Sequence, residues 1–285
     1  MEHKPIRLIA LDLDGTLLTT EKELSPENRE ALARAAAAGI EIVPATGRFF
    51  GGMPDFIRAL PFLHYAITVN GAQVWDIRAQ RAVVTAEIPC RRAIQIMEAL
   101  DRLPVIYDCY MDNWGWMTQS HYDRAADFAP HRHSLEMLQK LRTPVPELKA
   151  HLARVGHDVQ KIQMFFQDME LRAKAMEDLQ RQFPDTAVSS SIPRNVEINS
   201  GEATKGRALL SLAEHLGLTP TQTMAFGDDL NDLSMLQNAG IGVAMGNAAP
   251  EAKAAADEIT LDCDHSGVAA ALERLLPELF AEGQS

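Results

Sequence analysis

Acidic, amide and basic side chains follow short apolar segments at several points in this sequence. Asp12 and Asp14 lie at the end of the segment 6–13 (IRLIALDL), and Asp228 follows the segment 223–226. The other side chains placed in this way are Thr46, Arg48, Asn70, Asp229, Asn231 and Asp232, and Lys205 begins a predicted helix. Because ligands of open parallel sheets bind outside the carboxyl ends of the strands, we expect these groups to gather at one edge of a sheet.

This set of carboxylates with a lysine, an arginine and a hydroxyl is suited to a phosphate and a divalent cation. Hard oxygen ligands at short spacing favour Mg²⁺, which takes a few carboxylates together with waters and phosphate oxygens. Lys205 and the backbone N–H groups of the loop 14–16 can hold the phosphate, and Gly15 lets that loop turn tightly. A phosphate, Mg²⁺ and a nearby carboxylate predict phosphoryl transfer to an aspartate.

The two acids at positions 12 and 14 can have separate roles. They are two residues apart, so on an extended strand both side chains point to the same side. Asp12 can attack phosphorus, while Asp14 protonates the leaving oxygen and later takes a proton from the attacking water. This division requires a higher pKa for Asp14 than for Asp12.

The elements that must position these groups alternate between strand and helix in both halves of the chain. The first half contains strands at 6–13, 40–45 and 65–69, with a helix that opens at Ser25-Pro26 and ends at Gly39. The second half contains helices at 205–216, 231–239 and 268–276 and strands at 223–226, 241–244 and 258–261. This alternation predicts an α/β fold, a Rossmann-like parallel sheet with helices on both faces.

The middle of the chain has a different pattern. Helices and strands are mixed between residues 85 and 194, and Pro130, Pro144 and Pro146 interrupt them. We interpret this stretch as an α+β domain inserted into the parallel-sheet domain. The predicted domains are therefore a discontinuous core, 1–84 with 195–285, and an inserted domain, 85–194.

Composition and charge exclude several other classes. The chain has 285 residues, 46% hydrophobic and 23% charged, which is an ordinary globular mixture. Its net charge of −12 opposes binding to nucleic acid or to an anionic membrane surface. Cys90, Cys109 and Cys263 lack the spacing of a zinc site or a disulfide framework. Since no apolar run approaches the roughly 18–20 residues that span a bilayer, we expect a cytoplasmic protein without nucleic-acid or membrane partners.

The order of the motifs is more specific than any one of them. A single Asp-x-Asp pair also occurs on solvated turns and in the metal sites of glycosyltransferases. Over almost its whole length, however, this sequence resembles the haloacid dehalogenase superfamily, and within it the Cof-type phosphatases. The motifs that carry the resemblance are 12–18 (DLDGTLL), Thr46-Gly47-Arg48, Lys205-Gly206 and 227–232 (GDDLND), with NGA at 70–72 and AMGNA at 244–248.

The resemblance implies a nucleophile, an acid/base and a metal site. Asp12 is the expected nucleophile, which forms an aspartyl-phosphate, and Asp14 is the expected general acid/base. Mg²⁺ is expected to bind Asp12, the backbone carbonyl of Asp14 and Asp228. Asp232 is expected to support this metal site.

The resemblance also implies how substrate is held. Thr46 and Lys205 are expected to bind the phosphoryl group, and Asn231 to contact it. Arg48, which follows Gly47, is expected to contact the substrate or the inserted domain. That domain is expected to be the family's cap, which closes over the site and reads the leaving group.

The sequence leaves the substrate and some functional alternatives open. Sugar phosphates, nucleotides and phosphorylated cofactors all fit the expected small phosphorylated metabolite, and the protein can be a monomer or a homodimer. A phosphomutase and a non-metabolic phospho-acceptor regulator use the same aspartyl-phosphate. The residues of the inserted domain that are candidates for contacting the substrate are Tyr107, Tyr110, Trp114, Trp116, His121, His131, His133 and Arg194. Some of them, such as Trp114 and Trp116, alternate along a strand, as residues of a domain core often do.

Overall fold

The chain forms two compact units in a computed structural model that describes residues 5–129, 132–192 and 194–281. Unit 1 holds the described residues of Met1–Arg48, Met53–Thr85 and Thr204–Ser285, and unit 2 those of Phe49–Gly52 and Ala86–Ala203. The domain limits expected from the sequence stay a prediction. They differ from these units at β11 (Asn195–Ser200), which pairs with a strand of unit 2.

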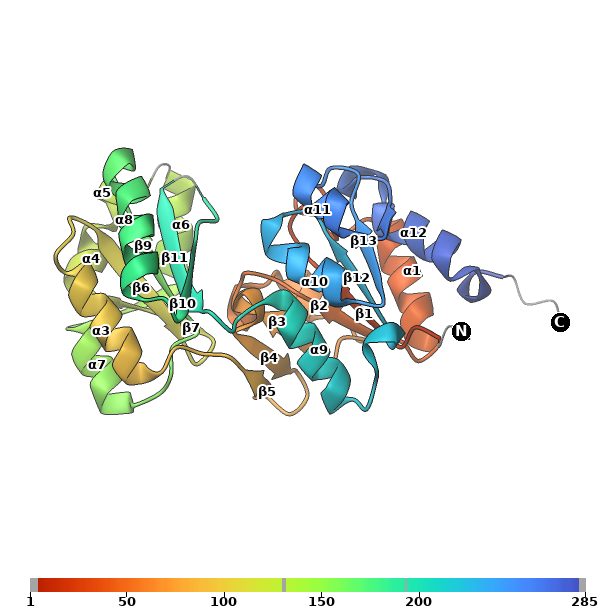
Figure 1. Ribbon diagram of the computed structural model, residues 1–285, viewed down its shortest axis with the longest axis horizontal. Helices are drawn as coiled ribbons and strands as arrows, with labels where there is room; N and C mark the ends of the chain where they lie inside the picture. The colour runs from red at the N-terminus through yellow and green to blue at the C-terminus, as the bar shows by residue number, and fades with distance from the viewer. Residues whose placement is uncertain (1–4, 130–131, 193, 282–285) are drawn as a thin grey trace. The chain divides into compact units, whose positions relative to one another are not determined.

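A five-stranded parallel sheet forms the centre of unit 1 (Figure 1). Its order is β14-β13-β12-β1-β2, and each neighbouring pair is parallel. The strands are β1 (Leu8–Leu11), β2 (Glu41–Pro44), β12 (Thr223–Gly227), β13 (Ile241–Ala244) and β14 (Glu258–Ile259). The predicted α/β class with a parallel sheet is confirmed. The order places β1 between β2 and β12, so the first and last parts of the chain meet at the centre of the sheet.

Different helices cover the two faces of this sheet. Leu8 and Val43 point to the face on which α9 (Lys205–His215) and α10 (Leu233–Asn238) pack. On the opposite face lie α1 (Pro26–Ala37) and α12 (Gly267–Leu275), which contact each other (Figure 1). Within the described ranges, unit 1 has two further α-helices, α2 (Asp55–Arg58) and α11 (Pro250–Ala255).

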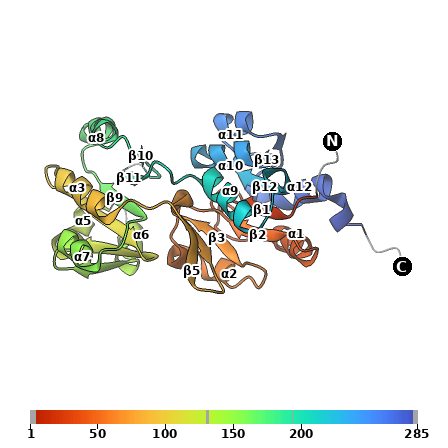
Figure 2. The ribbon, with the colours of Figure 1, turned by 60° about the horizontal axis from the view of Figure 1, so that its bottom comes forward.

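The strand expected at 65–69 is present but is not a member of the parallel sheet. β3 (Tyr65–Thr68) pairs antiparallel with β4 (Gln73–Asp76), which pairs with β5 (Arg81–Thr85) (Figure 2). Only isolated bridges, such as Ala45 with Ile67, connect β3 to the end of β2. The chain reverses directly after β3, because Val69, Asn70 and Gly71 all have positive φ. A tight reversal returns the chain beside the strand it has just left, which favours an antiparallel hairpin.

Unit 2 contains a six-stranded mixed sheet of order β10-β11-β9-β6-β7-β8. Its strands besides β11 are β6 (Ile106–Met111), β7 (Trp114–Thr118), β8 (Arg142–Val145), β9 (Lys161–Phe165) and β10 (Thr186–Ser189). Among the described strands of this sheet, only β7 and β8 pair in parallel. Pro144 is tolerated because β8 is an edge strand. This separate mixed sheet confirms the inserted α+β element of the predicted fold class.

The apolar face of that sheet packs on three helices. These are α3 (Cys90–Leu100), α7 (Leu148–Val155) and α8 (Met169–Gln182). Tyr107, a candidate cap residue, lies in this core, and Trp116 packs against it. Three shorter helices follow β7: α4 (Gln119–Asp123), α5 (Ala125–Phe128) and α6 (Arg132–Lys140). His131 and the side chain of His133, two further candidates, lie outside the described residues.

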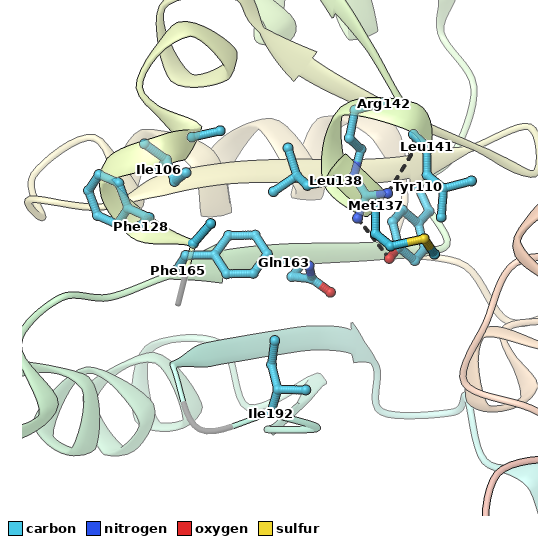
Figure 3. A pocket seen from close by; sticks show the side chains of 12 residues that line it. Ile106, Tyr110, Phe128, Met137, Leu138, Leu141, Arg142, Gln163, Phe165 and Ile192 are labelled. Carbon is cyan, nitrogen blue, oxygen red and sulfur yellow. Dashed lines mark hydrogen bonds between the residues drawn. The ribbon is translucent and has the colours of Figure 1, made fainter. Parts of the chain in front are cut away.

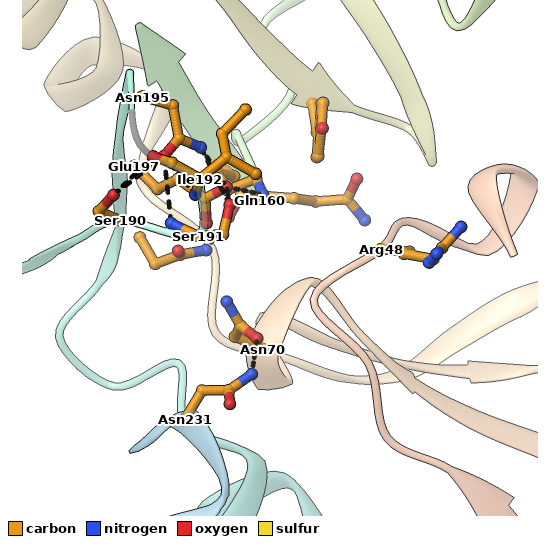
Figure 4. Close-up of polar contacts among 12 residues, drawn as sticks. Arg48, Asn70, Gln160, Ser190, Ser191, Ile192, Asn195, Glu197 and Asn231 are labelled. Carbon is orange, nitrogen blue, oxygen red and sulfur yellow. Dashed lines mark hydrogen bonds and ion pairs between the residues drawn. The ribbon is translucent and has the colours of Figure 1, made fainter. Parts of the chain in front are cut away.

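The opposite face of the sheet carries buried ion pairs. Arg142 Nε lies 2.9 Å from Asp108 Oδ2, and Lys161 Nζ lies 2.9 Å from Glu197 Oε1. Glu197 also accepts a hydrogen bond from Ser191 Oγ at 2.7 Å (Figure 4). Burial alone would raise the pKa of Glu197, but the charge of Lys161 and the hydrogen bonds outweigh it, so the pKa is lowered.

We expect the Glu197–Lys161 pair to make folding pH-dependent. A lowered pKa in the folded state stabilises the fold above the unfolded pKa of about 4.5, and this contribution is lost as pH falls through the folded-state pKa. Glu197→Gln should therefore be less stable at neutral pH and lose less stability on acidification. The measurement is urea unfolding at pH values from about 7 to 3, with the exposed Glu136→Gln as control. Equal pH slopes in the wild type and Glu197→Gln would contradict this prediction.

No helix within the described ranges is both long and apolar enough to cross a membrane.

Candidate active site

The candidate residues follow three adjacent strands of unit 1 at their carboxyl ends. Asp12 follows β1, Thr46 follows β2 and Asp228 follows β12. The Asp12 backbone N–H donates to Phe226 O at 3.0 Å, which extends the ladder between β1 and β12 by one residue. Asp12 and Thr46 are 7% and 2% exposed. Their position therefore results from strand order and is fixed by the central sheet.

Lys205 lies at the centre of this group. It is fully buried at the first residue of α9, and its Nζ donates to Asp12 Oδ1 at 2.5 Å and Asp232 Oδ1 at 2.6 Å. Burial lowers the pKa of Lys205, but the two carboxylates outweigh burial and raise it. Lys205 therefore stays charged and holds both acids in place.

Two glycines allow α9 to approach so closely. A Cβ on Gly71 would lie 2.2 Å from Thr204 O and 3.0 Å from Lys205 N, and φ of Gly71 is +95°. A Cβ on Gly206 would lie 2.2 Å from Ser234 O on α10. The turn after β3 and the neighbouring helix thus both fix the start of α9, and with it Lys205.

Three carboxylates converge beside Lys205. Asp12, Asp228 and Asp232 each offer an oxygen within 4.8 Å of the others. Burial is the main cause that raises the pKa of Asp12 to about 7 and that of Asp228 to about 6. Their mutual repulsion adds to this effect, and Lys205 opposes it. One lysine does not balance three acids, so the cluster is suited to a divalent cation with hard oxygen ligands.

Short contacts orient the members of this cluster. Asp228 Oδ1 accepts from Thr16 Oγ1 at 2.7 Å, and Asp232 Oδ2 accepts from the backbone N–H groups of Asp228 and Asp229 at 2.9 and 3.1 Å. Gly15 has φ +89°, and a Cβ there would lie 2.4 Å from Asp228 Oδ2. The loop after β1 and the loop after β12 therefore fit together only with glycine at position 15.

Asp14 is not one of the three clustered acids and is bound by two cations instead. Arg48 binds both of its oxygens, with Nε 2.9 Å from Oδ2 and Nη2 2.8 Å from Oδ1. Lys22 Nζ also lies 3.0 Å from Oδ1. Burial raises the pKa of Asp14, but Arg48 and Lys22 outweigh burial and lower it, whereas the pKa of Asp12 is raised to about 7. This order is the reverse of the one expected from the sequence, because the two cations bind the Asp14 carboxylate while Asp12 is buried beside other acids. The contact with Lys22 was not predicted, because this residue lies in an irregular loop without a motif.

The remaining motif residues lie around this centre. Thr46 Oγ1 accepts from Arg48 N at 3.2 Å, and a Cβ on Gly47 would lie 3.0 Å from Asn70 Oδ1. Asn231 Nδ2 donates to that same oxygen at 3.1 Å (Figure 4). Asn70 thus connects two of the predicted binding motifs.

The position of Gly71 gives a testable consequence. We expect Gly71→Ala to move the start of α9 and to lower the catalytic rate of this site about 100-fold, since displacements of about 1 Å have effects of this size. Gly39→Ala is the matched control, because Gly39 also has positive φ (+82°) but no atom lies within 4 Å of its Cβ position. That control should lose about 1–2 kcal/mol of stability and keep its activity. Equal activity of the two variants would contradict the role given to Gly71.

Comparisons with known proteins assign the chain to a family. A family model described as haloacid dehalogenase-like hydrolase matches residues 9–272. The chain is 31% identical to the 5-amino-6-(5-phospho-D-ribitylamino)uracil phosphatase YcsE of Bacillus subtilis, over 95% of this chain and 96% of the relative. It is 33% identical to the pyridoxal phosphate phosphatase YbhA of Escherichia coli, over 90% and 93% of the two chains.

A solved structure shows the same fold over nearly the whole chain. The crystal structure of a haloacid dehalogenase-like hydrolase from Bacteroides thetaiotaomicron superposes with a TM-score of 0.81 at 30% identity, covering 95% of this chain and 99% of the other. The family predicted from the motifs is thereby confirmed, as is the class of enzyme. This protein belongs to the haloacid dehalogenase-like hydrolases, as one of the Cof-type phosphatases that act on phosphomonoesters.

Proposed function

We propose that the protein is a Mg²⁺-dependent phosphatase that hydrolyses phosphomonoesters of small metabolites through an aspartyl-phosphate on Asp12. The observation that carries the proposal is the buried contact of Lys205 with Asp12 and Asp232, beside Asp228. Sugar phosphates, nucleotides and phosphorylated cofactors are the candidate substrates. A cytoplasmic location and a monomeric or dimeric state stay predictions.

The metal site would use the groups that the sequence and the structure bring together. Asp12, Asp228 and the backbone carbonyl of Asp14 would hold Mg²⁺, and Asp232 would orient the loop of Asp228 through its two backbone N–H groups. When bound, Mg²⁺ supplies positive charge beside the carboxylates and the phosphate oxygens. The raised pKa values of Asp12 and Asp228 fit this role, because they report negative charge that Lys205 alone does not offset.

Asp12 and Lys205 would perform the first chemical step. An Asp12 carboxylate oxygen attacks phosphorus, the bond from phosphorus to the ester oxygen breaks, and the phosphoryl group is transferred to Asp12. Lys205 and Thr46 bind the phosphoryl oxygens, and Lys205 offsets their charge in the transition state. Asn231, which donates to Asn70, would contact the phosphate.

Asp14 would move the protons. It donates a proton to the leaving oxygen, and in the second step it takes one from the water that attacks the phosphorus of aspartyl-phosphate and releases inorganic phosphate. Arg48 and Lys22 occupy the Asp14 carboxylate in the structure. Asp14 must therefore exchange these partners for the leaving oxygen, which leaves Arg48 available to the substrate.

The experiment is an assay of phosphate release from sugar phosphates, nucleotides, pyridoxal phosphate and an aryl phosphate. It is run with Mg²⁺ and with EDTA. We expect release that depends on Mg²⁺ and that differs between substrates. Turnover that persists in EDTA would contradict the metal role. A requirement for a bisphosphate activator would indicate the phosphomutase alternative, and a stable phosphoryl group on Asp12 the phospho-acceptor alternative.

A further inference from the structure

A cavity of about 280 Å³ lies within unit 2, between the sheet and the helices that follow β7 (Figure 3). Its sheet wall is formed by Ile106 on β6 and by Gln163 and Phe165 on β9. Phe128 on α5 and Leu138 on α6 form the facing wall. Every residue that lines the cavity belongs to unit 2.

The mouth of the cavity exposes apolar side chains. Met137 and Ile192, which line it, are 36% and 44% exposed. They are two of only seven large hydrophobic side chains with such exposure in the described parts of the chain. Single exposed apolar residues are common on protein surfaces, but apolar residues that gather at a hollow are typical of binding sites.

One polar side chain in the cavity lacks a partner among the described residues. Gln163 is 7% exposed, and its amide makes no hydrogen bond with any residue that the structure describes. Figure 3 shows this amide pointing into the space between Leu138 and Ile192. Buried amides are almost always hydrogen-bonded. A group with both a donor and an acceptor is therefore presented to whatever fills the cavity.

The charged residue at the end of the cavity is already paired with an opposite charge. Arg142 donates to Leu141 O at 3.1 Å and to Tyr110 Oη at 2.9 Å, and its Nε pairs with Asp108. Because Asp108 neutralises Arg142, the cavity offers no free cation to an anionic ligand. Its volume exceeds the roughly 150 Å³ that suffices for a benzene ring.

We propose that this cavity binds a small uncharged molecule with a ring-sized apolar body and one amide group. The ring packs between Phe128 and Phe165, and the amide pairs with Gln163 through one donated and one accepted hydrogen bond. The proposed contacts all lie in unit 2, and the proposal does not rest on the phosphatase chemistry. If the cavity binds no such molecule, the proposed function is unaffected. If the proposed function is wrong, the cavity proposal is likewise unaffected.

The test uses benzamide and toluene as probes of the full-length protein. Methyl NMR spectra are recorded during titration, because Ile106, Met137, Leu138 and Ile192 place methyl groups on the cavity. We expect saturable shifts confined to these methyl groups, and tighter binding of benzamide than of toluene. Absence of saturable shifts up to the solubility of benzamide would overturn the proposal, and so would equal affinity for both probes.

Two variants locate the binding. Gln163→Leu should weaken benzamide at least fivefold while it keeps or strengthens toluene binding, because only the hydrogen-bonding group is removed. Gln139→Leu makes the same change at an exposed position of α6 and should alter neither affinity. If Gln163→Leu fails to fold, Ala129→Phe replaces it in the test. Ala129 is half-buried and lines the cavity, so a phenylalanine there should fill the cavity and abolish binding of both probes. Unchanged benzamide affinity in the folded variant used would overturn the proposal.

Discussion

Asp12→Asn is expected to lower phosphate release by about 10⁴-fold or more, because loss of a covalent nucleophile has effects of this size. Asparagine keeps the shape of the side chain but is a far weaker nucleophile than a carboxylate. Its amide oxygen can still accept from Lys205, so the buried contact at the centre of the site is retained in part. The measurement is the steady-state rate with saturating Mg²⁺ on the best substrate of the panel.

The control for this variant is Asp55→Asn. Asp55 is an exposed acid at the start of α2, where it pairs with Arg58. Its replacement removes the same charge from unit 1 and should leave the rate unchanged. Substantial activity in Asp12→Asn, with the control at the wild-type level, would mean that Asp12 does not accept the phosphoryl group.

Lys205→Met is expected to remove both activity and stability. The fully buried ammonium holds Asp12 and Asp232, and its removal leaves two buried carboxylates without a cation. Breaking a buried ion pair by removing one partner costs about 3–5 kcal/mol. We expect a loss of this size in the free energy of unfolding of unit 1, measured in EDTA by denaturant titration. Mg²⁺ should restore part of the stability, because it supplies positive charge to the same acids.

Lys149→Met is the matched control for this loss. Lys149 also pairs with an aspartate, Asp101, but its side chain is 25% exposed and that of Asp101 is 41% exposed. Pairs near the surface contribute about 1 kcal/mol or less. Equal losses of stability in the two variants would show that the burial of Lys205 is not what makes it important.

The positions of Asp12, Thr46 and Asp228 could be predicted because they follow from strand order. Each lies directly after an apolar segment short enough to be a buried parallel strand, and parallel strands place their carboxyl ends at one edge. Lys205 could be placed by a similar rule, since Thr204 caps a helix that begins at this residue. These features depend on local patterns that are visible in the sequence.

The contacts between side chains could not be predicted in the same way. The pairing of Lys22 with Asp14 depends on the path of an irregular loop, in which Lys22 itself has positive φ. The direct contact of Asp232 with Lys205 depends on the packing of α9 against α10, and the sequence indicated only a supporting role for Asp232. Spacing along the chain does not encode such distances.

The strand after Arg48 shows a second limit of sequence patterns. Residues 65–68 have the apolar character of a parallel-sheet strand, yet they form a hairpin, because the positive φ values of Val69, Asn70 and Gly71 reverse the chain. Glycine and asparagine favour such a turn, but Val69 conceals it, since β-branched residues rarely adopt positive φ. Likewise, the buried pair of Lys161 with Glu197 gave no sequence signal, because isolated charges on strands are usually solvated.

The central claim is that Asp12 carries the phosphoryl group during turnover. The most direct measurement mixes the enzyme and Mg²⁺ with excess of a good substrate, quenches with acid within the first turnover and maps the protein by mass spectrometry. We expect a transient phosphoryl group on the peptide that contains Asp12, which disappears as inorganic phosphate is released and is absent in Asp12→Asn. Rapid phosphate release with no phosphoryl group on that peptide at any time in the first turnover would contradict the account.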